Sequence, residues 1–198
     1  IKIWNTELVS LSTYRGHHDV VFDAQFHPTE PSLFLSCSQD GRTVLWDTRK
    51  NKPASALGES VSGFAPTCLA WQPSAPKMFG TGDEGGHVNV RDLRMVVEKT
   101  VNCQPHSRLV TSLSFSSDRP SILASTSEDC KVAVISLGVV DTSPVVYTSD
   151  AHRDFVSGSA WGGRDLLLTC GWDGEVVQHT LNSAAPNGNP KLQLNGEL

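Results

Sequence analysis

Three side chains near the N-terminal end of the sequence have the chemistry of a hydrolytic site. His17, Ser38 and Asp40 are the residue types of a catalytic triad, in which histidine takes the proton of a serine nucleophile and aspartate orients the histidine. Such a site also needs an exposed serine beside a cleft, with hydrogen-bond donors aimed at the developing oxyanion. The role of these three residues therefore depends on the elements that hold them.

The triad-like residues belong to a segment, residues 16–47, that the chain repeats. Residues 21–26 and 33–37 alternate apolar and polar side chains, and a turn follows at Asp40, which predicts short antiparallel strands joined by tight turns. Apolar residues recur at fixed distances after His17, His106 and His152. The turn acids recur at intervals of 44, 45 and 44 residues, as Asp40, Glu84, Asp129 and Asp173. This regularity indicates a tandem array of β units.

The segment opens with Gly16-His17 and closes with Trp46-Asp47, and in this it resembles a WD repeat. In that family each repeat supplies most of one four-stranded blade of a β-propeller. The resemblance implies an all-β fold, a WD40-type β-propeller with about four and a half blades present, out of about seven in a complete propeller. We expect four-stranded blades without long helices, built from repeats at residues 16–47, 62–92, 105–136 and 151–180.

The two ends of the chain lead to further expectations about its organisation. Residues 1–5 match residues 43–47, so the chain is expected to begin inside an earlier blade and to be the C-terminal part of a longer protein. Residues 182–198 contain several Asn and Pro and no sustained apolar period, which predicts a flexible C-terminal tail after a propeller portion at residues 1–181.

The same resemblance implies a structural role for the triad-like residues. In WD repeats the loop histidine bonds the turn aspartate and a strand serine, and the serine reaches the indole of a tryptophan on the next strand. Burial favours this series of hydrogen bonds, because each buried polar group left unpaired would cost about 1–3 kcal/mol. The expected members are His17, Ser38, Asp40 and Trp46 in the first copy, His106, Ser127 and Asp129 in the third, and His152 and Asp173 in the fourth.

Composition and motifs argue against several other classes of function. No apolar run approaches the ~20 residues that span a bilayer, and no nucleotide-binding glycine motif occurs. The histidines lie at repeat spacing and the five cysteines form no Cys-x-x-Cys pair, so we expect neither a metal nor a cofactor. The net charge of −5 argues against direct nucleic-acid binding and weakly favours basic partners. An odd number of cysteines fits a reducing compartment, so we expect a cytoplasmic and nuclear location.

Functional surface is expected at the blade tips, since strand positions are committed to packing. In propellers of this type the residue before each turn acid and the third residue after each loop histidine ring the central channel. Phe155 and Trp172, with Arg153 beside Phe155, are residue types that anchor interfaces, although the two aromatics could instead pack on each other and stiffen the loop. The candidate partner-binding residues are Gln39, Asp83, Leu109, Glu128, Arg153, Phe155 and Trp172.

Several stretches of the sequence resemble one particular group of WD-repeat proteins. They are residues 34–40, 45–55, 127–134, 152–156 and 171–179. Together they resemble the WD-repeat subunits of methylosomes, the complexes of type II protein arginine methyltransferases. The resemblance implies a non-enzymatic scaffold or adaptor that binds the methyltransferase in a hetero-oligomer. It also implies that this subunit helps to present histones, through their tails, and spliceosomal Sm proteins for symmetric arginine dimethylation.

A second hypothesis is a substrate receptor of a cullin ubiquitin ligase. Residues 46–49 (Trp-Asp-Thr-Arg) fit the Trp-Asp-x-Arg signature of such receptors, whereas residues 91–94 (Arg-Asp-Leu-Arg) lack the tryptophan. With one good match and one poor one, this is the lesser hypothesis. An enzyme ranks last, because the triad-like residues are better explained as a structural chain.

Overall fold

The computed structural model describes residues 1–50, 52–59, 62–94, 99–138, 143–163 and 165–181, and these residues form β-strands and no helix. The strands pair antiparallel in chain order into five sheets. The first two sheets are β1 (Lys2–Trp4) and β2 (Ser10–Thr13), then β3 (Val21–Phe26), β4 (Leu33–Ser38), β5 (Arg42–Asp47) and β6 (Pro53–Glu59). The third is β7 (Pro66–Trp71), β8 (Met78–Asp83), β9 (Val88–Asp92) and β10 (Lys99–Cys103). The last two are β11 (Val110–Phe115), β12 (Ile122–Ser127), β13 (Val132–Ser136) and β14 (Val145–Ser149), then β15 (Val156–Trp161), β16 (Leu166–Gly171) and β17 (Val176–Thr180).

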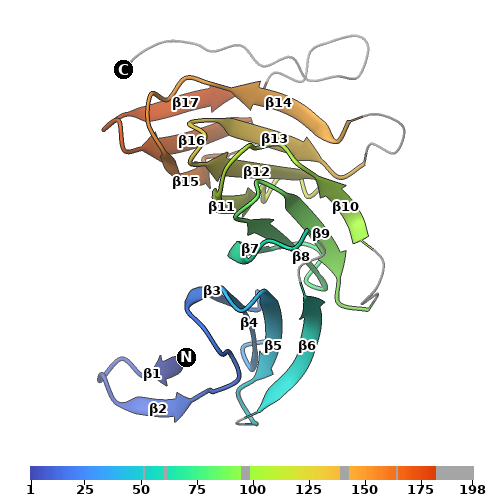
Figure 1. Cartoon of the computed structure of the whole chain (residues 1–198), viewed down its shortest axis with the longest axis vertical. Helices are drawn as coiled ribbons and strands as arrows, with labels where there is room; N and C mark the ends of the chain where they lie inside the picture. Colours follow the sequence, from blue (N-terminus) through green and yellow to red (C-terminus); the bar gives the residue numbers. More distant parts are fainter. Residues whose placement is uncertain (51, 60–61, 95–98, 139–142, 164, 182–198) are drawn as a thin grey trace.

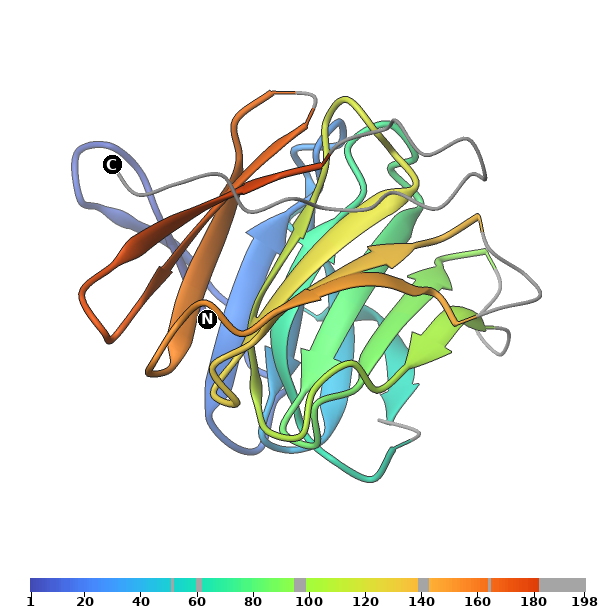
Figure 2. The same cartoon turned by 90° about the horizontal axis from the view of Figure 1, so that it is seen from above.

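The five sheets follow one another along the long axis of the molecule, from β1–β2 to β15–β17 (Figure 1). Seen from above, along this axis, they overlap one behind the other (Figure 2). The first strands of the four later sheets, β3, β7, β11 and β15, contact one another in turn. This arrangement confirms the expected all-β propeller portion.

The sheets differ in size from the expectation of four strands per repeat. Three of them have four strands, whereas β15–β17 has three within the described residues. The predicted tail, residues 182–198, lies outside the described part of the chain. Strands β1 and β2 form the two-stranded piece expected from the match between residues 1–5 and 43–47.

The apolar alternation of the sequence fills the layers between consecutive sheets. Strand β4 illustrates this, because Phe34 packs with Tyr14 and Trp46 on one side, while Leu35 and Cys37 pack toward the third sheet on the other. Comparable clusters lie between the third and fourth sheets and between the fourth and fifth. A strand covered by a sheet on each face is buried throughout, which is why β4 and β12 are almost entirely inaccessible.

Several hydrogen bonds between neighbouring sheets join their first strands. Thr67 Oγ1 donates to the carbonyl of Val110 over 2.6 Å, and Thr111 Oγ1 donates to the carbonyl of Val156. In the preceding pair of sheets, the amide of Leu69 donates to Asp23 over 2.9 Å. These bonds fix the first strands side by side, so the loops that precede them are held together along one rim of the array.

In each of the four later sheets, the turn between the second and third strand uses a left-handed residue. Gly41, Gly86 and Gly174 have φ between 80° and 84°, and Cys130 occupies the same turn position with φ 65°. A glycine adopts this conformation without steric cost, whereas a side chain on it is unfavourable. These four turn residues therefore occupy equivalent positions in the four repeats.

Candidate functional site

The polar side chains of the first full repeat form a buried relay. His17 Nδ1 donates to the carboxylate of Asp40 over 3.0 Å, which leaves Nε2 to accept from Ser36 Oγ over 2.7 Å. The indole Nε1 of Trp46 donates to the same Ser36 oxygen over 2.8 Å. Ser36 and Trp46 are both 0% exposed, so the relay is closed to solvent at its inner end. A serine enclosed in this way cannot present its hydroxyl to a substrate.

The prediction that Ser38 belongs to this relay was wrong. Ser38 Oγ donates to the carbonyl of Asp19 over 3.3 Å and accepts from the amide of Asp40 over 3.2 Å. Ser36 and Ser38 share one face of β4 because side chains of a strand repeat with period two. Ser36 lies one step deeper, level with the indole, whereas Ser38 lies at the strand end and anchors the loop.

The relay of the third repeat has the same geometry, and here too the predicted serine was wrong. His106 Nδ1 donates to Asp129 over 3.1 Å, and Ser125, not Ser127, donates to His106 Nε2 over 2.8 Å. Ser127 Oγ donates to the carbonyl of Arg108 over 3.2 Å. Burial opposes ionisation of Asp129, but hydrogen bonds from His106 and from backbone amides outweigh it and lower its pKa to about 2. The turn carboxylate therefore stays charged and holds the histidine proton on Nδ1.

In the fourth repeat the relay is longer. His152 Nδ1 donates to Asp173 over 2.9 Å, and its Nε2 accepts from Thr169 Oγ1 over 2.9 Å. Thr169 in turn accepts from Nε2 of His179 over 2.9 Å, so Nδ1 of His179 accepts from the hydroxyl of Tyr147 over 3.2 Å. Burial, with a smaller contribution from His152, lowers the pKa of His179 from 6.5 to about 4. His179 is therefore neutral at neutral pH, which leaves its Nδ1 able to accept from Tyr147.

The second repeat replaces the loop histidine. Ser62 Oγ donates to Asp83 over 2.6 Å, and His87 donates to the same carboxylate through its amide over 2.9 Å and through Nδ1 over 3.1 Å. Asp83 is 1% exposed, so its prediction as a partner-binding residue was wrong. Asp83 pairs with Pro66 as Ser38 pairs with Val21, so Glu84 is the residue equivalent to Gln39.

Sequence reasoning missed the hydroxyl residues that join the three histidine relays, namely Ser36, Ser125 and Thr169. With Thr81 of the second repeat, this position is Ser or Thr in all four repeats, at intervals of 45, 44 and 44 residues. The position of Ser38 and Ser127 carries Asp83 and Gly171 in the other two repeats. The unbroken Ser/Thr column was therefore a signal for the relay position. Tyr147 gave no such signal, because it reaches His179 from a neighbouring sheet.

The rim residues are paired by backbone hydrogen bonds. The amides of Gln39, Glu84, Glu128 and Trp172 donate to the carbonyls of Val20, Ala65, Leu109 and Phe155, respectively. Each bond joins the turn of one sheet to the residue just before its first strand, so both predicted rows lie along the same rim. Gln39 and Arg153 are exposed, Leu109 and Glu128 are partly exposed, and Trp172 is 71% exposed.

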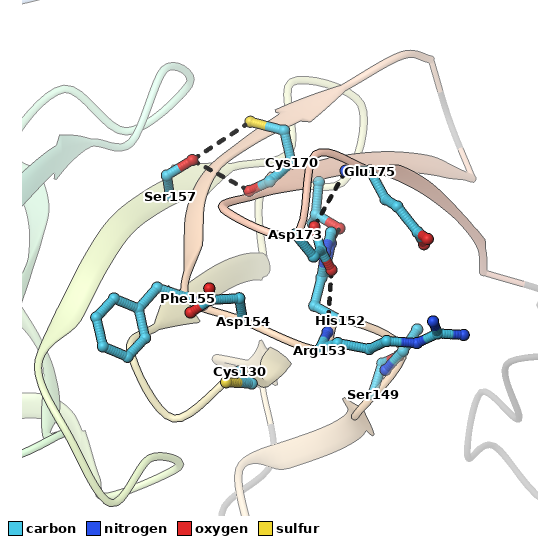
Figure 3. Close-up of polar contacts among 12 residues, drawn as sticks. Cys130, Ser149, His152, Arg153, Asp154, Phe155, Ser157, Cys170, Asp173 and Glu175 are labelled. Atoms are coloured by element: carbon cyan, nitrogen blue, oxygen red, sulfur yellow. Dashed lines mark hydrogen bonds and ion pairs between the residues drawn. The ribbon is translucent and has the colours of Figure 1, made fainter.

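An aromatic and cationic cluster occupies the C-terminal end of this rim. The rings of Phe155 and Trp172 lie 5.4 Å apart at 50°, and the guanidinium of Arg108 lies 5.4 Å from the Phe155 ring centre. Arg153 does not join it, because Arg153 and Phe155 extend to opposite sides of their loop (Figure 3). Arg108 is thus a member that the sequence did not reveal, since it comes from the preceding repeat.

The opposite rim carries the two Asp-x-Arg sequences. Arg49 forms a two-bond fork with Asp47, and Arg94 forms the same fork with Asp92, each with its amide also bonded to that carboxylate. The fork forms in both repeats, although only one carries the tryptophan of the Trp-Asp-x-Arg pattern. A local hydrogen-bond arrangement at the strand end therefore explains the pattern here.

The described residues contain neither a cluster of metal-ligating side chains nor a membrane-spanning helix. No group of three or more His, Cys, Asp or Glu side chains is arranged to hold a metal ion. No helix in this part of the chain is capable of spanning a lipid bilayer.

Comparison with known proteins agrees with the repeat geometry. The family described as "WD domain, G-beta repeat" matches residues 8–47 and 98–136, which correspond to β2–β5 and β10–β13. The chain is 36% identical over 186 residues to the methylosome protein WDR77 of Xenopus laevis, covering 92% of the chain and 54% of that protein. It is 29% identical over 145 residues to histone acetyltransferase type B subunit 2 of Debaryomyces hansenii, covering 67% of the chain and 34% of that protein.

A third relative is a protein transport protein. The chain is 23% identical over 179 residues to the protein transport protein SEC31 of Chaetomium globosum, covering 89% of the chain and 14% of that protein. The chain thus spans about half of the methylosome relative, 54%, and smaller shares of the other two. The repeats, the sheet architecture and these matches together show that the chain contains WD repeats and forms part of a β-propeller that is similar to the methylosome WD-repeat protein.

Proposed function

We propose that this chain serves as the non-catalytic WD-repeat subunit of a protein arginine methyltransferase complex. In this role it binds a type II methyltransferase and helps to present histones and Sm proteins for symmetric dimethylation. The observation that carries the proposal is the 36% identity to a methylosome protein across 92% of the chain. A weaker similarity to a histone acetyltransferase subunit is consistent with a protein that works beside a histone-modifying enzyme.

A binding role follows from how the chain uses its polar residues. The histidine, hydroxyl and aspartate side chains that could suggest catalysis are buried and saturated by one another. Exposed and chemically varied side chains gather instead on the rim, where Trp172 projects into solvent beside Phe155. Tryptophan and arginine carry much of the energy of protein interfaces. The rim is therefore the surface we assign to partner binding.

The charge of the same loops suits basic substrates. Glu84, Glu128, Asp154 and Glu175 lie on the loops and turns of this rim, and each is exposed or partly exposed. Carboxylates placed around a binding surface accelerate association with basic segments and make it sensitive to salt. Histone tails and arginine-rich tails of Sm proteins are segments of this kind. We propose that the protein acts in the cytoplasm and the nucleus, where such substrates occur.

Co-purification tests this function. The full chain, carrying an affinity tag, is used to capture a type II arginine methyltransferase from purified components, with the adaptor of a cullin ligase offered in parallel. We expect the methyltransferase to bind and the adaptor not to bind. Methylation of a histone tail is then measured with and without the chain, and we expect a faster reaction in its presence. Binding of the adaptor alone would refute the proposal.

A further inference from the structure

Arg108 is a cation held by an aromatic ring. Its guanidinium lies 5.4 Å from the centre of the Phe155 ring, within the ~6 Å range of a cation–π interaction. Within the described part of the chain it makes no hydrogen bond and no ion pair. Its loop is fixed independently, because Ser127 Oγ donates to the Arg108 carbonyl over 3.2 Å. The side chain can therefore leave the ring without disturbing the backbone.

The ring that Arg108 contacts is one of a pair. Phe155 and Trp172 lie 5.4 Å apart with their planes tilted by 50°, so the rings contact each other directly, and a planar cation that stacks on the outer face of one ring lies beside the other. The amide of Trp172 donates to the carbonyl of Phe155 over 2.8 Å, which holds the two residues together through their backbones. Trp172 is 71% exposed, and among the described residues no cation lies over its ring, so this half of the Phe155–Trp172 pair is open to a ligand.

Two carboxylates on the same rim carry negative charge that no described ion pair neutralises. The amide of Glu128 itself donates to the carbonyl of Leu109, the residue after Arg108, and Glu175 follows the turn that begins at Trp172. Among the described residues, neither carboxylate takes part in an ion pair. An incoming cation therefore meets two aromatic rings and unpaired negative charge in one region of the rim.

The geometry points to the Phe155–Trp172 pair as a binding site for an arginine side chain in a flexible segment of a partner, with Arg108 as an internal occupant that the incoming arginine displaces. The inference rests on the proposed function and names the chemical group that the rim holds. Arginine fits better than lysine, because its planar guanidinium stacks on aromatic faces and is more weakly hydrated than an ammonium group.

Removing the internal occupant should strengthen binding. An exposed cation–π contact is weak, so losing the competition from Arg108 corresponds to about a two- to fivefold gain in affinity. Loss of either ring should instead weaken binding, because Phe155→Leu or Trp172→Leu removes the surface that receives the incoming arginine. Removing any positive charge from the rim could also raise the affinity for a basic peptide. Substitution of Arg153 is the control for this general charge effect. It lies two residues from Phe155 on the same loop but extends away from the ring (Figure 3).

The test is a titration of the full chain with an arginine-glycine peptide and with the same peptide in which each arginine is lysine. We expect the wild type to prefer the arginine peptide, Arg108→Ala to bind it about two- to fivefold more tightly, and Arg153→Ala to change affinity less. Phe155→Leu and Trp172→Leu should remove the preference for arginine over lysine. Melting temperatures of all variants establish that they are folded.

Two results would overturn the arginine site. The first is equal affinity of the wild type for both peptides. The second is an equal gain in affinity from Arg108→Ala and from Arg153→Ala at 0.5 M salt. At this salt concentration the screening length is about 4–5 Å, so long-range charge effects are screened. No methyltransferase is present in this titration, so its failure is distinct from failure of the proposed function. That function is tested by co-purification of the wild-type protein.

Discussion

His179 of the last sheet and Trp46 of the second occupy equivalent strand positions, and each donates a ring N–H to the hydroxyl of the preceding strand, over 2.9 and 2.8 Å. The two rings differ in the polar atoms that remain after this hydrogen bond. The indole of Trp46 has no further polar atom, whereas His179 keeps a second nitrogen that can take up a proton. The same relay is therefore insensitive to pH at Trp46 and sensitive to it at His179.

The first prediction concerns this sensitivity. Because the pKa of His179 is about 4 in the folded protein and 6.5 otherwise, the unfolded chain binds an extra proton between these values. The free energy of unfolding should therefore fall as the pH is lowered from 6.5 to 4, by roughly 3 kcal/mol in total from this residue. Chemical denaturation at a series of pH values measures this slope.

His179→Trp is the matched variant, since it keeps a ring N–H for Thr169 and removes the titrating nitrogen. Its denaturation should show a shallower pH dependence than the wild type over the same interval. An identical slope in the two proteins would show that other groups are responsible.

The second prediction separates the two serines of β4. Ser36→Ala leaves His17 Nε2 and Trp46 Nε1 without partners, so it should lower the free energy of unfolding by about 1–3 kcal/mol. Ser36→Thr should be much milder, because Thr169 fills the equivalent position in the last sheet. Urea denaturation of the three proteins tests this. Equal losses for Ala and Thr would mean that the cost comes from packing rather than from the hydroxyl.

The third prediction concerns the neighbouring acids of the second repeat. Asp83 is buried and accepts from Ser62, Gly85 and His87, so Asp83→Ala should cost about 2–4 kcal/mol of stability. Glu84→Ala, at the partly exposed rim position, should change stability by no more than about 0.5 kcal/mol. Thermal and denaturant unfolding distinguish them. The reverse order would restore Glu84 as the structural acid.

The fourth prediction is that the rim aromatics act in binding. Phe155→Ala and Trp172→Ala should each weaken the complex with the methyltransferase or with a histone tail by about 1–2 kcal/mol, as expected of interface anchors. Trp4→Ala is the matched control, because Trp4 is also exposed and also lies near a cation, Lys2, but belongs to β1. Calorimetric titration measures the affinities.

Unfolding curves complete this comparison. If both variants bind normally, partners use another surface of the protein. If they bind poorly only when they are also unfolded, the two aromatics serve packing, as their ring contact with each other allows.

The sequence was sufficient for the repeating units because period-two alternation is a local property. Residues 21–26 were predicted as a strand and form β3 with the same bounds. The relay was harder to predict, since Ser36 and Ser38 share one face of β4 and only their depth relative to Trp46 selects between them. Depth depends on the neighbouring sheet, which a single repeat does not encode.

Two other misses have a similar physical origin. The pair of acids at residues 83–84 offers two alignments, and the loss of the loop histidine in that repeat removed the residue that would have selected one. The position of Arg108 over Phe155 could not be read from sequence, because the two residues belong to different repeats and meet only when the sheets stack.

The hydrogen bond from Tyr147 to His179 also bears on how the array comes apart. Tyr147 lies on β14, the outer strand of one sheet, whereas His179 lies on β17 of the next. In the first full repeat the relay ends at Trp46, inside its own sheet. Separating the last sheet therefore breaks a relay, in addition to apolar contacts. Hydrogen exchange should find the last two sheets opening as one cooperative unit, with the amides of β14 and β17 protected to the same degree.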